Sequence, residues 1–271
     1  MSTIIAFVIA LLPAILLWVY ILKKDAKPEP MKQIWKAILW GVLIVIPIVI
    51  VENVISAILF GEGGEANSVI GHTIDAFFVA AIPEESFKLL ALWLVLRSNP
   101  HFDEHFDGIV YSVCVGLGFA TVENIFYVVG DGDWASVGIM RAIFSVPGHY
   151  AFAVLMGYYY ARYHFVNRSF LNCISIWGVP VLAHGIYDAI VMNVGVNDYL
   201  VLPIIGLLIF FCIKMHKACK KKIVAQLEMD QAGQLAAYNQ TAYNQTAYNQ
   251  TAYNQTTYNQ TETKYNKSET T

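Results

Sequence analysis

The chain has 271 residues, of which 57% are hydrophobic and only 14% are charged, and its formal net charge is −3. Soluble domains carry about 25% charged residues, so this composition excludes an ordinary soluble protein. The weakly acidic balance also gives no reason to expect nucleic acid as a partner. We expect a protein of the cell membrane that is surrounded by the lipid bilayer.

Seven apolar runs follow one another along the chain. A helix needs about 20 residues to cross ~30 Å of hydrocarbon, and in lipid each segment must satisfy its own backbone hydrogen bonds. The alternation over about ten residues that marks a transmembrane β-strand is missing. The sequence therefore predicts an all-α, polytopic transmembrane helical bundle with about seven spans. These lie near residues 3–22, 36–60, 70–96, 108–129, 137–161, 171–193 and 198–216.

Lysine and arginine gather in alternate loops. Cytoplasmic loops carry an excess of these residues, while the loops on the other side have none. We therefore expect a multi-pass protein with its N-terminus outside and its C-terminus in the cytoplasm. The residues that set this orientation are Lys23, Lys24, Lys27, Lys32, Lys36, Arg97, Arg162, Arg168, Lys214, Lys217, Lys220, Lys221 and Lys222.

After the last run the chain changes character. Residues 237–261 are five copies of a pentapeptide, four of which read Ala-Tyr-Asn-Gln-Thr. Such a polar repeat lacks the apolar surface that offsets the entropy of ordering. We predict a transmembrane domain over residues 1–222 and a disordered, low-complexity cytoplasmic tail over residues 223–271.

Four of the apolar runs contain polar residues where lipid would penalise them. Ionisable groups inside a span indicate a functional site, and the helical positions put these groups in one layer of the membrane. Residues four apart share a helix face, which pairs Glu84 with Lys88 and His184 with Asp188. The whole set is Glu84, Glu85, Lys88, Glu123, Asn124, Arg141, His149, His184 and Asp188.

Two glutamates and two histidines around buried water are suited to peptide hydrolysis. A carboxylate can take a proton from water, and histidine can stabilise the oxyanion. No cofactor is required by this reading. Zinc is the alternative, held by His149, His184 and either Glu84 or Glu85, although no His-Glu-x-x-His motif is present. A proton-coupled or ion-coupled transporter is a non-enzymatic alternative, but the internal repeat of many transporters is not evident.

Four segments in this order resemble the PrsW family of intramembrane proteases, which is related to the CAAX prenyl endopeptidases and the bacteriocin-processing proteases. The resemblance covers about residues 1–216. The segments are Glu84-Glu85-x-x-Lys88, Phe106-Asp107-Gly108 through Gly116-x-Gly118-Phe119-Ala120-x-x-Glu123-Asn124, Arg141-Ala142 with His149, and His184-Gly185-x-Tyr187-Asp188.

The resemblance implies a protease domain over residues 1–222 that cleaves single-span membrane proteins, such as an anti-sigma factor, in regulated proteolysis. By similarity Glu84 would activate water, Glu85 and His149 would assist, and His184 would bind the oxyanion. A CAAX-type protease acting on prenylated peptides is the second enzymatic reading. The supporting residues would be Lys88, Glu123, Asn124, Arg141 and Asp188.

Two positions depart from the pattern of the prenyl proteases. Lys88 stands where that group tends to place an arginine one residue later, and Asp188 stands where it often has asparagine. An ionised aspartate cannot donate a hydrogen bond, so His184 is the expected oxyanion donor.

Overall fold

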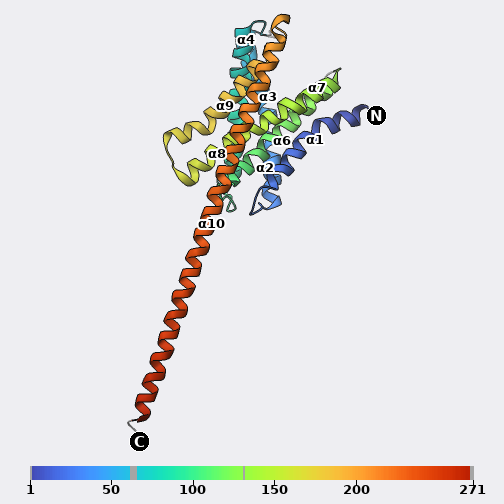
Figure 1. The fold of residues 1–271 in the computed structure, drawn as a ribbon. Coiled ribbons are helices and arrows are strands. Elements are labelled where there is room, and N and C mark those ends of the chain that lie inside the picture. Colours follow the sequence, from blue (N-terminus) through green and yellow to red (C-terminus); the bar gives the residue numbers. More distant parts are fainter. Residues whose placement is uncertain (1, 62–65, 131, 269–271) are drawn as a thin grey trace. The chain divides into compact units, whose positions relative to one another are not determined.

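The computed structural model describes residues 2–61, 66–130 and 132–268, and these ranges contain helices and no strand (Figure 1). The residues up to Leu227 form one compact unit, and those from Glu228 onward form a second. The all-α expectation is confirmed over the described ranges.

The first unit begins with long helices that follow the apolar runs. A helix of about 20 residues rises ~30 Å, which is why these runs fold as single helices or as helices in direct succession. In chain order the first elements are α1 (Ser2–Leu22), α2 (Met31–Leu43), α3 (Val45–Phe60), α4 (Val69–Ile74), the π-helical turn η1 (Asp75–Ala81) and α5 (Ile82–Leu96).

The second half of the bundle repeats this mixture of α-helices and π-helical turns. It consists of α6 (Asp107–Gly130), α7 (Trp134–Met140), the π-helical turn η2 (Arg141–Ser145), α8 (Val146–Ala161), the π-helical turn η3 (Arg162–Val166), α9 (Phe170–Met192), the short 3₁₀ helix η4 (Asp198–Leu200) and α10 (Val201–Ser268).

Six of these helical stretches in the described ranges are long and apolar enough to cross a membrane, against the seven that the sequence predicts. The difference is the third run, which is helical without interruption from Val69 to Leu96. It carries Asp75, Glu84, Glu85 and Lys88, and these charges set it apart from the apolar spans.

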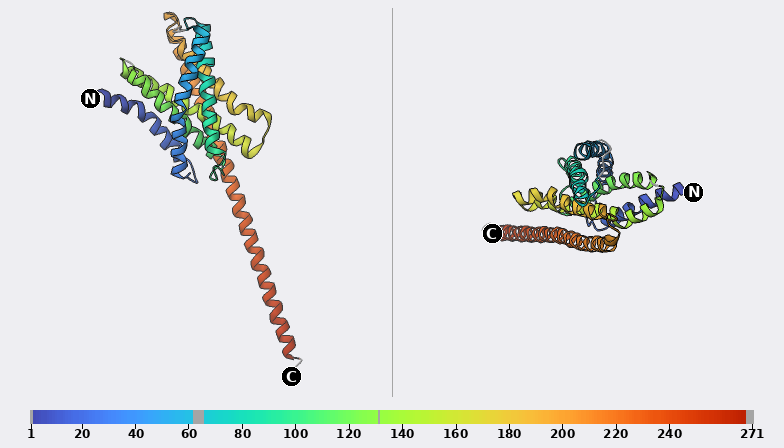
Figure 2. Two further views of the ribbon diagram at one scale, coloured as in Figure 1. Left: turned by 180° about the vertical axis from the view of Figure 1, so that it is seen from behind. Right: turned by 90° about the horizontal axis from the view of Figure 1, so that it is seen from above.

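Helix α6 lies at the centre of the bundle, where it packs against α1, α2 and α8. Small residues allow its close contacts, as is common between helices in membranes. A Cβ atom on Gly41 of α2 would overlap the carbonyl group of Val115, and one on Gly118 would overlap that of Ile38. Helices α1 and α7 lie side by side in all three views (Figure 1, Figure 2).

Two π-helical turns stand directly before the helices that carry polar site residues. The turn η1 precedes α5, whose second residue is Pro83, and η2 precedes α8, whose second residue is Pro147. Proline lacks a backbone donor, and π-helical turns occur frequently at functional sites. Pro83 and Pro147 therefore each lie directly after a widened helical turn.

The first part of α10 belongs to the bundle. Leu208, Met215, Cys219 and Ile223 are part of the hydrophobic core, and Gln226 Nε2 donates to the carbonyl of Tyr158 over 3.3 Å. These contacts carry the first unit to Leu227, five residues beyond the predicted boundary at residue 222.

The second unit contains the repeats, for which the sequence predicts disorder. The structure describes them as helix up to Ser268, while residues 269–271 lie outside the described ranges. Hydrogen bonds within the helix, such as the one from Gln240 Nε2 to Asn244 Oδ1, join side chains four apart. Tyr238 and Tyr243 are each 71% exposed. The repeats therefore bury little apolar surface, which was the reason for predicting disorder, but the structure describes their backbone as helical.

Candidate active site

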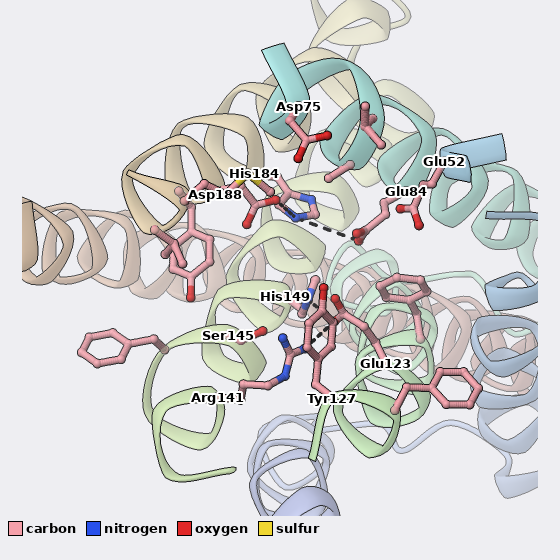
Figure 3. A pocket seen from close by; sticks show the side chains of 18 of the residues that line it. Glu52, Asp75, Glu84, Glu123, Tyr127, Arg141, Ser145, His149, His184 and Asp188 are labelled. Carbon is pink, nitrogen blue, oxygen red and sulfur yellow. Dashed lines mark hydrogen bonds and ion pairs between the residues drawn. The ribbon is translucent and has the colours of Figure 1, made fainter. Parts of the chain in front are cut away.

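Three buried side chains from three helices meet at one point. Glu84 of α5, His149 of α8 and His184 of α9 each offer a ligand atom, and these atoms all lie within 4.8 Å of one another (Figure 3). None of the three is more than 5% exposed. The structure thus brings together residues that are 100 positions apart in the chain.

Lys88 joins the two adjacent glutamates. Its Nζ donates to Glu84 Oε2 over 2.7 Å and to Glu85 Oε1 over 2.8 Å. The same atom lies 3.3 Å from His149 Nδ1 and 4.2 Å from the centre of the Phe119 ring. One buried ammonium group therefore balances two carboxylates, whereas the helical spacing alone indicated only the pair with Glu84.

The ring of His184 is held between carboxylates. Its Nδ1 lies 2.9 Å from Glu85 Oε1, and its Nε2 lies 3.0 Å from Asp188 Oδ2. The same Nε2 is 3.9 Å from Glu84 Oε2. The ring also stacks on Phe152 with 4.6 Å between the ring centres. Both nitrogens and one face of the imidazole are thus fixed.

His149 is positioned by a chain of polar contacts from α6 and η2. Its Nε2 lies 2.8 Å from Glu123 Oε2, which also accepts a hydrogen bond of 2.8 Å from Arg141 Nη2. Arg141 Nε donates to Asn124 Oδ1, and Asn124 Nδ2 donates to the carbonyl of Ala10 in α1. The structure therefore connects Glu123, Asn124 and Arg141 to the cluster through His149.

A cavity of about 630 Å³ opens beside the cluster and is lined by Glu84, His149 and His184. Glu85 does not line it and is fully buried. The remaining wall is mainly apolar and includes Val45, Ile48, Val49, Val79, Phe119, Phe126, Phe144, Tyr187 and Leu208. Of the two adjacent glutamates, Glu84 is therefore the one that can meet a substrate.

Sequence reasoning missed two carboxylates of this cavity, Glu52 and Asp75 (Figure 3). Glu52 is the single acidic residue in the run 36–60. An ionisable residue alone in an apolar run indicates a functional site, so Glu52 could have been selected from the sequence. Asp75 lies near the beginning of the run 70–96, a position that by itself favours contact with solvent. The structure places it on the cavity wall instead, because the helix continues through η1 without a break.

Ser86, next to the glutamate pair, is engaged in structural hydrogen bonds. Its Oγ donates to the carbonyl of Ile82 over 2.6 Å and accepts a hydrogen bond from Trp177 Nε1 over 2.9 Å. It does not line the cavity. This geometry gives Ser86 no role as a nucleophile.

The residues of the cluster fit a zinc ion. A carboxylate and two imidazoles form a donor set that catalytic zinc sites use, with one position open for water. His149 directs its second ring nitrogen at Glu123, as metal-binding histidines commonly do. Within the described part of the chain, Oε2 of Glu85 is buried and has no hydrogen-bond partner. The ligands would be Glu84, His149 and His184.

The chain matches known proteins over most of its length. Residues 29–215 match the family model described as "PrsW family intramembrane metalloprotease". "Protease PrsW" of Oceanobacillus iheyensis is 35% identical over 198 residues, which are 72% of this chain and 87% of that protein.

Two further relatives carry the same name. "Protease PrsW" of Clostridioides difficile is 33% identical over 78% of this chain and 89% of that protein. The protein of the same name from Bacillus subtilis is 32% identical over 79% of this chain and 94% of that protein. No solved structure matches. Since the family model and these relatives agree, the chain belongs to the PrsW family of intramembrane metalloproteases and is a multi-pass membrane peptidase.

Proposed function

We propose that the chain hydrolyses peptide bonds of membrane protein substrates at the cavity wall formed by Glu84, His149 and His184. The observation that carries this proposal is the convergence of these three buried groups on one cavity. A buried carboxylate and two imidazoles at the edge of a mainly apolar cavity are suited to activating water beside a membrane-embedded peptide.

Glu84 is the proton acceptor in this proposal because it faces the cavity and Glu85 does not. It takes one proton from a water molecule while the water oxygen bonds to the carbonyl carbon of the scissile peptide. His184 Nε2, which lies 3.0 Å from Asp188 Oδ2 and 3.9 Å from Glu84 Oε2, redirects its N–H from Asp188 to the resulting oxyanion. The proton on Glu84 then passes to the leaving nitrogen as the carbon–nitrogen bond breaks.

The other polar residues position these groups. Glu85 holds Lys88 and His184 through Oε1, and Asp188 holds the opposite nitrogen of the His184 ring. Glu123, fixed by Arg141, orients His149 toward the cluster. Each reactive side chain is thus held by a second polar contact, which reduces the reorganisation needed for catalysis.

A zinc ion bound by Glu84, His149 and His184 would polarise the substrate carbonyl and lower the pKa of a bound water. Glu84 would then be a ligand and not the proton acceptor. Because the two uses of Glu84 exclude each other, treatment with a chelator separates them.

We further propose that the substrate is a single-span membrane protein of the anti-sigma-factor type. The support is the resemblance of the four sequence segments and the apolar wall of the cavity, which suits a peptide that enters from the bilayer.

The same proposal places the N-terminus outside and the C-terminus in the cytoplasm, as the lysines after α1 and in α10 indicate. Reporter fusions at each terminus test this orientation. Phosphatase activity at the N-terminus and fluorescence of a cytoplasmic reporter at the C-terminus would agree with it, and the opposite pattern would contradict it.

The proposed reaction is tested with purified protein in liposomes. Candidate single-span anti-sigma factors and a prenylated peptide are offered in parallel, with and without a chelator followed by zinc. Cleavage of a single-span protein supports the substrate proposal, and trimming of the prenylated peptide alone would favour the prenyl-protease reading. Loss of cleavage with chelator and its return with zinc would assign Glu84, His149 and His184 as ligands. Cleavage that resists the chelator supports Glu84 as the proton acceptor.

A further inference from the structure

A second cluster of carboxylates lies in the loops that join α1 to α2 and α5 to α6. One ligand oxygen from each of Asp25, Glu104 and Asp107 lies within 4.8 Å of the others. None of the three lines the cavity of the peptidase site. This cluster is therefore separate from the catalytic groups and needs its own explanation.

The side chain of Asp107 is the deepest part of this cluster and is fully buried. Its Oδ2 accepts hydrogen bonds from the backbone nitrogens of Asp103, over 3.0 Å, and Glu104, over 2.7 Å. Its Oδ1 is buried and receives no N–H or O–H hydrogen bond in the residues that the structure describes, and the neighbouring side chain in contact with Asp107 is another carboxyl group, that of Glu29. A buried acceptor without a partner costs roughly 1–3 kcal/mol, and more when it is charged, so this oxygen indicates a missing partner.

A fourth carboxylate adds to the negative charge. Glu29 is 9% exposed and accepts a hydrogen bond from the hydroxyl of Tyr111. Burial raises the pKa of Glu29, the Tyr111 contact lowers it, and the neighbouring Asp25 raises it further. Several carboxylates thus crowd one small volume at the start of α6.

The nearest lysine is engaged at the rim of the cluster. Lys27 Nζ donates to Asp103 Oδ2 over 2.6 Å, and about half of each of these two side chains is exposed. The hydrogen bond to Asp103 raises the pKa of Lys27, and the negative charges of Glu104 and Asp107 raise it further. The ammonium group donates to Asp103, however, and not to Asp107. The buried Oδ1 of Asp107 therefore needs a partner other than this ammonium group.

We propose that Asp25, Glu104 and Asp107 bind a divalent cation of the hard, oxygen-preferring class, Mg²⁺ or Ca²⁺. The donors are all carboxylate oxygens, which such ions select, whereas zinc prefers nitrogen and sulfur ligands. The ion would supply the partner that Asp107 Oδ1 lacks. It would also hold the loop 23–30, which follows α1, against the loop 97–106 and the start of α6.

The test is isothermal titration of the full chain in detergent, stripped with a chelator and then titrated with Mg²⁺ and Ca²⁺ separately. We expect one saturable site for at least one of the two ions. Glu104→Gln, which removes the charge of the least buried ligand, should weaken binding by about tenfold or more, since affinity follows the number of charged ligands. Asp25→Asn provides a second variant with the same expected loss should Glu104→Gln fail to fold.

Two controls locate the binding. Glu84→Gln disables a ligand of the peptidase cluster and should leave this titration unchanged. Asp198→Asn removes an exposed acidic charge from the 3₁₀ helix η4 and should also leave it unchanged. A wild-type chain that binds neither ion, or binding that persists in both Glu104→Gln and Asp25→Asn, would overturn the proposal. Loss of binding in Glu84→Gln would also overturn it, by assigning the ion to the peptidase site.

Discussion

Lys88 is the residue on which the charge balance of the active site depends. It is 3% exposed and pairs with two buried carboxylates. Helical spacing predicted the contact with Glu84. The remaining contacts of the cluster, such as Glu85 with His184, depend on how α5 meets α9, which no spacing within one helix can specify.

Replacing Lys88 with methionine should strongly destabilise the protein. Glu84 and Glu85 would be left buried without their shared cation, and breaking a buried ion pair from one side costs about 3–5 kcal/mol. Thermal unfolding in detergent measures this effect. The matched control is Lys27→Met, which breaks an exposed pair with Asp103 and should change the unfolding temperature little. Equal unfolding temperatures for the two variants would contradict the importance assigned to Lys88.

Glu123 should act on catalysis through His149. Glu123→Gln keeps the shape of the side chain but removes the charge that holds both His149 and Arg141. We expect kcat to fall about 10–100-fold, the usual range when an outer contact of a site histidine is removed, with KM nearly unchanged. A fall in thermal stability without any fall in kcat would show that Glu123 is structural only.

At the scale of elements, the apolar runs predicted the helices well because each segment in lipid must satisfy its own backbone hydrogen bonds. The π-helical form of the turns η1 and η2 was not predictable, since a proline such as Pro83 indicates a distorted helix but not the geometry of the distortion. Their effect is visible at Asp75, which lines the cavity although its position near the start of the run indicated solvent.

The crossing of α2 and α6 yields a prediction at this scale. In Gly41→Ala the new methyl group would overlap the backbone carbonyl of Val115, and overpacking costs roughly 1–3 kcal/mol or more. The control is Gly206→Ala in α10, where nothing lies within 4 Å of the added atom. Thermal unfolding should separate the two variants. A Gly41→Ala protein as stable as wild type would contradict this close helix contact.

At the scale of the whole molecule, the four sequence segments sufficed to predict the family, and the apolar runs sufficed to predict the polytopic helical fold. The seven predicted spans include the third run, which is helical but does not count among the six apolar spans because it carries Glu84, Glu85 and Lys88. The repeats were predicted to be disordered because they offer little apolar surface to bury, and the structure describes them as an exposed helix.

All the site residues lie in the unit that ends at Leu227. A chain that stops after Leu227 should therefore fold and retain the cleavage rate of the full chain. The control is a chain that stops after Leu207, which loses the core residues Leu208, Met215, Cys219 and Ile223 and should unfold at a lower temperature. A folded but inactive chain ending at Leu227 would show that the repeats contribute to activity.

The decisive measurement is the rate at which wild type and Glu84→Gln, prepared side by side in liposomes, cleave the same single-span membrane protein. Loss of a carboxylate that activates water lowers the rate by about 10²–10⁴-fold. We expect a loss of this size or larger, with the thermal unfolding of both proteins measured in parallel to exclude misfolding. Cleavage by folded Glu84→Gln at the wild-type rate would contradict the assignment of this cluster as the active site.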